Sequence, residues 1–342
     1  MAHIMLTKAC NLNCPYCFAN EFVNKCKEEI TMENFNKAKD FLLSSGGSHI
    51  GFIGGEPTVH PLILDFMENV IEDKRVRQCT IFTNGLNFDK IVYKFTNPKF
   101  STLINVNSIE TMGETRYKKM LDNIEILHNQ FSLGSRVSFG YNIHGTDFNY
   151  DYIIDLCKKY KKNQLRISIC VPNDDEHRNL NSLEWFRLVT PRLFEFFQAL
   201  YDNKIIPHYD CNLLPICATT VEQKELLLKI VQLAEEMNVR TNLLSTCSTC
   251  NPVIDILPDL KAVRCFGMSD HLKVDIENFA NIRELVNYFK TEIDSYKYIA
   301  IGNSECKECP KRLIQDCTGG CLAYKDELIK RVRNAVNASQ NL

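Results

Sequence analysis

The sequence lacks a charge excess, a long hydrophobic run and a secretion leader. Its 342 residues have a formal net charge of −2, so nothing predicts a nucleic-acid partner. No apolar run approaches the 18 or more residues of a membrane span, so we expect no membrane association. Residues 1–7 do not show the charged and then apolar pattern of a signal peptide. These absences predict a cytoplasmic protein.

Low-complexity linkers and solenoid-type repeats are also missing, whereas cysteine is abundant. The composition, 45% hydrophobic and 24% charged, is that of a globular chain. Sixteen cysteines are unusual for a chain without a leader. Because a reducing cytoplasm keeps thiols from forming disulfides, closely spaced cysteines indicate metal or cluster ligation. We expect the isolated cysteines to be inert buried thiols, and the isolated histidines to be surface or capping groups; among them are Cys26, Cys79, Cys157, Cys170, His60, His128 and His177.

Strand-like and helix-like segments alternate through the first two thirds of the chain, which predicts βα units and a parallel sheet. The expected strands are 3–7, 48–53, 78–83, 102–107, 136–143 and 164–171. The expected helices are 32–43, 61–72, 116–129, 150–160, 182–202 and 221–237. Periodicity alone does not distinguish a partial barrel from an open doubly wound sheet. In both, a site is expected at the carboxyl ends of the strands.

Three cysteines follow the first expected strand with the spacing C-x3-C-x2-C: Cys10, Cys14 and Cys17. Iron–sulfur clusters are usually held by four cysteines. Three thiolates on one tight loop can hold three irons of a [4Fe–4S] cluster and leave the fourth iron open. This motif therefore predicts a catalytic cluster with a free coordination position.

The motif, including the aromatic Tyr16 before its third cysteine, resembles the signature of radical S-adenosylmethionine (SAM) enzymes. The resemblance implies an α/β fold with a partial (β/α)6 TIM-type barrel, SAM bound at the open iron, and reductive cleavage of SAM. The resulting 5′-deoxyadenosyl radical is expected to abstract hydrogen from a substrate.

A second motif, Gly54-Gly55-Glu56-Pro57, follows the next expected strand and resembles the GGEP run that recognises the amino group of SAM in this family. Glycines there allow close backbone approach, and a carboxylate can pair with an ammonium group. Polar groups at later strand ends are expected to contact the ribose and carboxylate. The remaining expected SAM contacts are Tyr16, Asn107, Ser108, Asn142, Arg166 and Val171.

The C-terminal part holds further cysteines, in C-x2-C-x7-C-x3-C spacing from Cys306 to Cys321. Residues 253–263 are expected to form a β-hairpin with a Pro-Asp turn between two more cysteines. This region resembles the SPASM and twitch auxiliary-cluster domains, although no cysteine follows Cys321. The resemblance implies one or two auxiliary [4Fe–4S] clusters; a zinc site is the alternative. The expected ligands are Cys250, Cys265, Cys306, Cys309, Cys317 and Cys321, with Cys211, Cys217 and Cys247 as further candidates.

We therefore divide the chain into a radical SAM core, residues 1–210, and an auxiliary-cluster domain, residues 211–342, with the boundary between 205 and 245. The expected function is modification of a peptide or protein, by crosslinking or oxidation. Alternatives are a small-molecule dehydrogenase or cyclase of cofactor or antibiotic biosynthesis, and a non-enzymatic iron–sulfur protein. Candidate acids and bases are Asp210, Asp270 and His271. Expected partners are an electron donor such as flavodoxin or ferredoxin, and a separate leader-peptide-binding protein.

Overall fold

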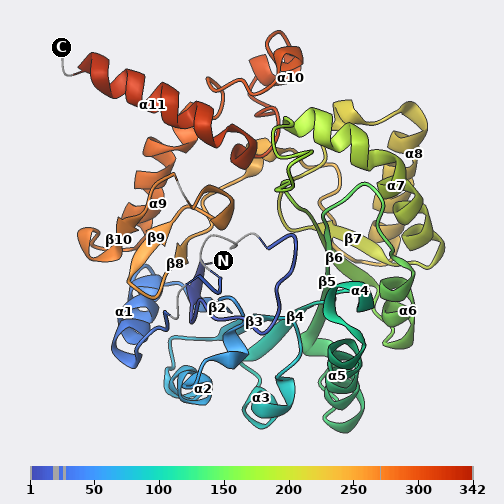
Figure 1. Ribbon diagram of the computed structural model, residues 1–342, viewed down its shortest axis with the longest axis vertical. Helices are drawn as coiled ribbons and strands as arrows, with labels where there is room; N and C mark the ends of the chain where they lie inside the picture. The colour runs from blue at the N-terminus through green and yellow to red at the C-terminus, as the bar shows by residue number, and fades with distance from the viewer. Residues whose placement is uncertain (1, 18–22, 26–27, 270, 341–342) are drawn as a thin grey trace. The chain divides into compact units, whose positions relative to one another are not determined.

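The computed structural model describes residues 2–17, 23–25, 28–269 and 271–340 (Figure 1). The chain forms two compact units, one of residues 1–139 and 252–289, the other of residues 140–251 and 290–342. Each unit therefore combines segments from both sides of residue 210. The division into a core and an auxiliary-cluster domain at 205–245 stays a prediction, since it concerns cofactors and not compactness.

The first unit is built on a mostly parallel sheet with the strand order β10-β9-β8-β1-β2-β3-β4. In its parallel pairs, Ile4 of β1 lies opposite Phe52 of β2, and Phe52 lies opposite Ile81 of β3. The strands are β1 (Ala2–Met5), β2 (His49–Ile53), β3 (Gln78–Thr83), β4 (Phe100–Asn105), β8 (Asp255–Ile256), β9 (Lys261–Val263) and β10 (Val274–Asp275). Strand β5 (Val137–Ile143) crosses the boundary between the units.

Helices of the first unit lie along this sheet (Figure 1), and their buried residues are mostly apolar. The ring of Phe35 in α1 lies edge-on to Phe52 of β2 at 5.7 Å and stacks on Phe66 of α2 at 4.5 Å. All three rings are fully buried, so they form the core between helix and strand. The helices are α1 (Met32–Leu43), α2 (Ile63–Glu72), α3 (Phe88–Phe95), α4 (Ile109–Met112), α5 (Glu114–Glu125) and α9 (Ile282–Glu292), the last of which runs into the second unit.

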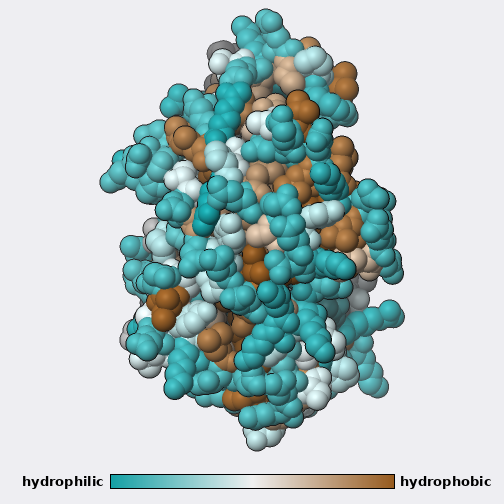
Figure 2. Space-filling model, turned by 90° about the vertical axis from the view of Figure 1, so that its right-hand side faces the viewer, coloured by the Kyte–Doolittle hydropathy of each residue, from teal (hydrophilic) through white to brown (hydrophobic). Residues whose placement is uncertain are grey.

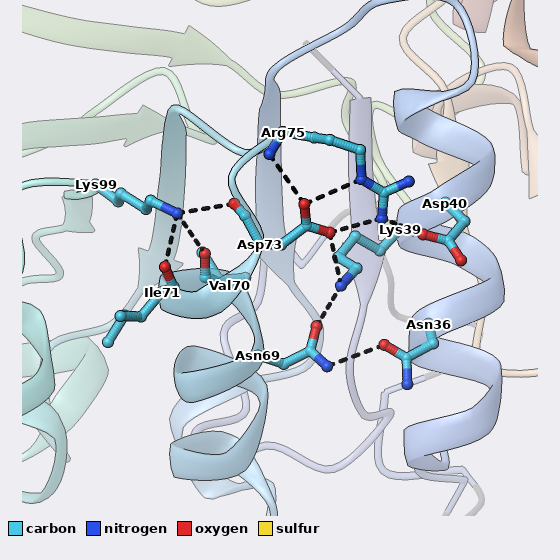
Figure 3. Close-up of polar contacts among 9 residues, drawn as sticks. All are labelled: Asn36, Lys39, Asp40, Asn69, Val70, Ile71, Asp73, Arg75 and Lys99. Carbon is cyan, nitrogen blue, oxygen red and sulfur yellow. Dashed lines mark hydrogen bonds and ion pairs between the residues drawn. The ribbon is translucent and has the colours of Figure 1, made fainter.

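A polar network closes the amino-terminal edge of this sheet (Figure 3). The Lys99 ammonium donates to the carbonyl oxygens of Val70, Ile71 and Asp73 at 2.8–2.9 Å and so satisfies the C-terminal end of α2. The Asp73 carboxylate binds Arg75, and also Lys39 at 3.0 Å. These two cations hold the pKa of Asp73 well below its usual range.

The second unit contains a parallel three-stranded arrangement, β5-β6-β7, and a helical, cysteine-rich C-terminal part. Its helix α7 begins at a capping box, in which the Asn181 side chain accepts from the backbone of Leu183 and Glu184. The further elements are α6 (Asp151–Lys159), β6 (Gln164–Ile169), α7 (Ser182–Asp202), β7 (Ile206–Tyr209), α8 (Val221–Glu236), α10 (Pro310–Leu313) and α11 (Asp326–Gln340).

Most predicted elements are present, but helix α3 was not predicted and several elements differ in their bounds. The fourth strand was predicted at 102–107, but β4 spans Phe100–Asn105, so Asn107 lies beyond the strand and not at its end. The helix predicted at 116–129 is α5, which begins at Glu114, and a π-helical turn, Ile126–Gln130, follows it. His60, predicted as a surface or capping group, is buried at 2% exposure, and its ring nitrogens contact the Ile30 carbonyl and the Leu62 N–H.

No helix among the described residues is both long and apolar enough to cross a membrane. On the face that Figure 2 shows, hydrophilic groups predominate and hydrophobic groups occur in separate areas between them. A groove of about 680 Å³ runs over α7 and α8 and is lined by side chains such as Phe194, Glu225 and Leu226. None of the predicted cluster or SAM residues lines this groove, so it is not the candidate site.

Candidate active site

The three-cysteine loop of the first unit is fastened to the ends of three neighbouring strands. At the end of β2, the backbone N–H groups of Gly55 and Glu56 donate to the carbonyl oxygens of Thr7 and Ala9 at 2.8 and 2.9 Å. At the end of β3, Asn84 donates through its side chain to the Asn11 side chain at 2.7 Å. These contacts join the loop to the carboxyl edge of the parallel sheet, where sites of such folds lie.

A third attachment joins the loop to the residue after β4. The Tyr16 hydroxyl donates to the side-chain oxygen of Asn107, which is 4% exposed. Sequence analysis assigned both residues to SAM binding, and the structure brings them together. Ser108, also predicted there, is the N-cap of α4, and its hydroxyl lies 3.4 Å from that of Thr111.

Gly55 has no room for a side chain. A Cβ at this position would lie 2.3 Å from the Ala9 carbonyl oxygen and 3.0 Å from Cβ of Cys10. At Gly54 a Cβ would lie 2.7 Å from the Thr7 carbonyl oxygen. The paired glycines are therefore needed for the close approach of two strand ends. Their predicted close approach to SAM stays a prediction.

The Glu56 carboxylate orders the strand ends from inside the protein. It is 1% exposed and accepts from the Thr58 N–H and hydroxyl, the Thr83 hydroxyl and the Asn84 N–H at 2.6–3.1 Å. Burial raises the pKa of Glu56, and these four donors oppose the rise. Three of these donors share Oε1 and one binds Oε2, so the carboxylate joins the end of β2 to the end of β3. A direct contact of this side chain with SAM stays a prediction.

The thiols of the loop lie close to one another. Burial raises the pKa of Cys10 to about 12, with smaller contributions from Glu56, Cys14 and Cys17. Burial also raises the pKa of Cys14 to about 11, to which Cys17 contributes. Below these values the thiols are protonated, and binding of iron must release their protons. The Cys17 N–H donates to the Cys14 carbonyl oxygen at 3.1 Å, which forms the turn that carries the second and third cysteines.

The donor set of the loop suits an iron–sulfur cluster. Cys10, Cys14 and Cys17 are three half-buried thiols on one loop, which the glycine contact at Cys10 closes in. They can supply three of the four cysteine positions of a [4Fe–4S] cluster and leave one iron open.

Apolar side chains pack around the same loop. Cys10 and Cys17 lie against a buried cluster that includes Met5, Ile53 and Phe266. Phe266 follows Cys265, the predicted auxiliary ligand that comes after β9 in the first unit. The hairpin predicted at 253–263 is present, because β8 pairs antiparallel with β9.

Three predicted residues of the second unit form a polar group at the carboxyl ends of β5, β6 and β7. Arg166 of β6 donates to the Asn142 side chain of β5 at 2.7 Å and forms an ion pair with Asp210, the residue after β7. Burial acts to lower the pKa of Arg166, but Asp210 and nearby thiols raise it overall. The ion pair thus fixes the Asp210 carboxylate beside the Arg166 guanidinium.

The other residues that the sequence singled out add little to the geometry of the site. Val171, which follows β6, is 37% exposed. The His271 N–H donates to the Met268 carbonyl oxygen at 3.1 Å in the first unit. Asp270 lies outside the described residues. Cys79 and Cys157 are fully buried, as predicted for inert thiols.

The second unit gathers eight of the nine predicted auxiliary cysteines. Burial raises the pKa of Cys247 to about 12, and Cys250, Cys317 and Cys211 contribute. Burial also raises the pKa of Cys217, and the nearby thiols of Cys306, Cys317 and Cys309 raise it further. Cys217 was predicted as a further candidate ligand. Its thiol neighbours are those of the C-terminal run.

Glycines again allow close packing between the cysteines. The Gly319 N–H donates to the Cys317 sulfur at 3.3 Å, and a Cβ on Gly319 would lie 3.2 Å from the Cys306 sulfur. A Cβ on Gly320 would lie 2.1 Å from the Ser182 hydroxyl, which itself donates to the Gly319 carbonyl oxygen at 3.0 Å. Both glycines have positive φ, which favours glycine. The Gly-Gly pair thus fixes the loop of the last two cysteines against α7.

Comparison with known proteins agrees with this site. The family model described as the radical SAM superfamily matches residues 4–186, more than half of the chain. The chain belongs to the radical SAM superfamily. Enzymes of this superfamily use a [4Fe–4S] cluster and SAM, so the predicted enzyme class and these two cofactors are confirmed.

Curated relatives match part of the chain. The GTP 3′,8-cyclase of Clostridium perfringens (strain SM101 / Type A) is 28% identical over 172 residues, which is 47% of this chain and 52% of that protein. The uncharacterized protein MJ0907 of Methanocaldococcus jannaschii is 27% identical over 226 residues, 62% of this chain and 75% of that protein. The chain spans about half the length of the cyclases that it matches.

Solved structures resemble the whole chain. AnSMEcpe with bound AdoMet and Kp18Cys peptide has a TM-score of 0.62 and 16% identity, and the match covers 100% of this chain and 99% of that one. SuiB of Streptococcus suis bound to S-adenosylmethionine has a TM-score of 0.57 and 15% identity, covering 94% and 72%. The fold is therefore that of radical SAM maturases, which confirms the predicted α/β partial barrel. The cysteine-rich C-terminal part fits an auxiliary-cluster domain.

Proposed function

We propose that this enzyme cleaves SAM reductively and modifies a peptide or protein substrate. The observation that carries the proposal is the second thiol group, Cys217 with Cys306, Cys309 and Cys317, in a chain that already has a three-cysteine loop. Four thiols suit one further [4Fe–4S] cluster. Many SPASM-type relatives with such centres act on peptides, and the likeness to AnSMEcpe with its bound peptide supports the same substrate class.

In this proposal Cys10, Cys14 and Cys17 hold the SAM-binding cluster. When bound, this cluster and SAM supply the hydrogen-abstracting radical chemistry. Glu56 holds the ends of β2 and β3 in place through its four donors. The backbone of the glycine motif, and Asn107 with Tyr16, offer polar groups to SAM. The apolar cluster around the loop excludes water.

In the second unit Arg166, held by Asn142 and Asp210, offers a guanidinium to a carboxylate, of SAM or of the substrate. The thiols of Cys247, Cys250 and Cys321 are left for a further auxiliary site in the second unit, and Cys211 adjoins Cys247. Cys265, in the first unit, stays a candidate ligand. We expect the enzyme to work in a reducing cytoplasm with an electron donor such as flavodoxin or ferredoxin, and with a separate leader-binding protein.

A second candidate function is small-molecule cyclisation, favoured by the sequence likeness to GTP 3′,8-cyclases. That likeness covers less than half of the chain. It therefore supports shared handling of SAM more than a shared substrate.

The test begins with the full chain, reconstituted anaerobically with iron, sulfide, dithionite and SAM. We expect release of 5′-deoxyadenosine, which the Cys10/Cys14/Cys17→Ala variant should not release. Absence of 5′-deoxyadenosine from the reconstituted wild type would refute the proposed activity. The variant should keep iron in its auxiliary site. Zinc in place of iron there would indicate a structural site.

The substrate class is tested with two incubations. A short cysteine-rich peptide encoded beside the gene should lose hydrogen mass or gain a crosslink, detected by mass spectrometry. GTP should remain unchanged under the same conditions. Conversion of GTP with an unmodified peptide would favour the cyclase alternative.

A further inference from the structure

A buried lysine lies among the auxiliary cysteines and has no role in the proposed function so far. Lys325 is the last residue of the 3-10 turn Leu322–Lys325 and is 3% exposed. Its ammonium donates to the carbonyl oxygens of Thr318 and Lys297. No ion pair with a carboxylate is found for it in the part of the chain that the structure describes. Burying an uncompensated charge is costly, so a counter-charge is expected nearby.

The surroundings of Lys325 supply thiols for that purpose. A Cβ on Gly319 would lie 3.5 Å from the Lys325 ammonium and 3.2 Å from the Cys306 sulfur, so both groups flank the same bare Cα. Cys306, Cys317, Cys247 and Cys321 are its electrostatic partners. Two of the three N–H groups of the Lys325 ammonium donate to carbonyl oxygens, so the third is available to a sulfur atom.

The ammonium is also held firmly in this place. A Cβ on Gly302 would lie 3.3 Å from the Lys325 side chain, so the stem of the lysine runs directly over that glycine. The Thr318 carbonyl belongs to the residue after Cys317, and the Thr318 hydroxyl donates to the Gly320 carbonyl oxygen at 2.7 Å. The lysine is thus fixed by the same loop that carries the last two cysteines.

We propose that Lys325 is the internal counter-cation of the auxiliary centre and raises its reduction potential. This inference rests on the proposed function, because it requires an auxiliary cluster at these cysteines. A thiolate-bound cluster is anionic, and its one-electron reduction adds a negative charge. A fixed cation beside it favours the reduced form, since charge, hydrogen bonding and exposure set the potential of such clusters. Lys325 is a positioning residue that acts through the cluster.

The test uses the full chain carrying the Cys10/Cys14/Cys17→Ala changes, so that only auxiliary iron is observed. Lys325→Met removes the charge with a similar shape, Lys325→Arg keeps the charge, and Lys325→Gln is a second neutral variant. Lys307→Met is the matched control, because it removes a charge next to Cys306 from an exposed side chain. Iron is counted, and the midpoint potential is followed by electron paramagnetic resonance during a dithionite titration with mediators.

We expect Lys325→Met and Lys325→Gln to keep auxiliary iron and to have a lower midpoint potential. A tenfold smaller ratio of reduced to oxidised cluster at a given potential corresponds to a shift of about 59 mV in the midpoint potential of a one-electron couple. Lys325→Arg and Lys307→Met should stay near the parent value. Loss of iron in both neutral variants, with iron retained in Lys325→Arg, would also support a counter-cation.

Other outcomes overturn the inference. If the iron-loaded Lys325→Met and Lys325→Gln variants keep the midpoint potential of the parent protein, the charge of Lys325 does not act on the cluster. Equal loss of iron in all three Lys325 variants would show a purely structural role. Absence of auxiliary iron from the parent protein would instead refute the auxiliary centre of the proposed function, which keeps the two failures distinguishable.

Discussion

Replacing Gly55 by alanine should break the connection between the glycine motif and the cysteine loop. The added Cβ would stand 2.3 Å from the Ala9 carbonyl oxygen, and real contacts of this kind are essentially never closer than 3.0 Å. The two backbones must therefore separate by about 0.7 Å. No flexible side chain can absorb this movement, because the obstacle is a carbonyl group.

The neighbouring hydrogen bond gives the magnitude. The Glu56 N–H donates to the same Ala9 oxygen at 2.9 Å, and a separation along that direction takes it to about 3.6 Å, beyond hydrogen-bonding distance. Overpacking costs about 1–3 kcal/mol, and the lost bond adds about 1 kcal/mol. We expect the free energy of unfolding to fall by about 2–4 kcal/mol. Because Cβ of Cys10 lies 3.0 Å from the added atom, its thiol should also move out of place.

The assay is urea unfolding, together with iron counting and release of 5′-deoxyadenosine after anaerobic reconstitution. Gly145→Ala is the matched control, since its nearest neighbouring atom would be 3.9 Å away, and it should stay within about 0.5 kcal/mol of wild type. A Gly55→Ala variant with wild-type unfolding midpoint and full catalytic iron would refute the reasoning that this close contact positions the loop.

Three other changes test the site and its support. Glu56→Gln places an amide nitrogen against the Asn84 N–H, now 2.8 Å from the carboxylate, and should lower the free energy of unfolding by about 1.5–3 kcal/mol in urea titration. Cys217→Ser should lower auxiliary iron in the Cys10/Cys14/Cys17→Ala background, whereas the neighbouring Ala218→Ser should not; equal iron in both would remove Cys217 from the ligand set. Cations hold the pKa of Asp73 low. Its ionised carboxylate therefore stabilises the fold above about pH 4, and this stabilisation is lost as the pH falls. Asp73→Asn should therefore have a lower free energy of unfolding than wild type at pH 7, and the difference between the two should narrow below pH 4. A difference that does not change with pH would contradict this.

The fold could be predicted where sequence periodicity and local chemistry agree. Helices α1 and α7 have the predicted bounds, because a threonine or asparagine caps each start and an apolar face follows. Strand β4 was placed two residues late, since the polar residues after it were included in the strand. Helix α3 was not predicted, although its hydrophobic face is clear, because it has only eight residues and its start has no side-chain cap hydrogen bond.

The candidate site could be predicted as a set of positions but not as a set of contacts. Spacing identified the cysteine loop and the glycine motif, because both have strict local requirements. The use of Glu56 by four internal donors could not be foreseen, since Thr83 and Asn84 reach it from another strand. The ammonium of Lys325 was missed for the same reason. Its partners, Thr318 and Lys297, meet it only through packing.

The two kinds of similarity report on different parts of the chain, and this difference guides the choice of substrate. Identity to GTP 3′,8-cyclases is confined to less than half of the chain. The likeness to AnSMEcpe extends over all of it, at an identity that establishes only the fold. We expect both groups to bind and cleave SAM at the strand ends of the core. We propose that substrate choice depends instead on the C-terminal part, where the Lys325 ammonium lies beside the loop of the last two cysteines. Variants there should alter the fate of the substrate while leaving SAM cleavage in place, and loss of both together would place substrate choice in the core.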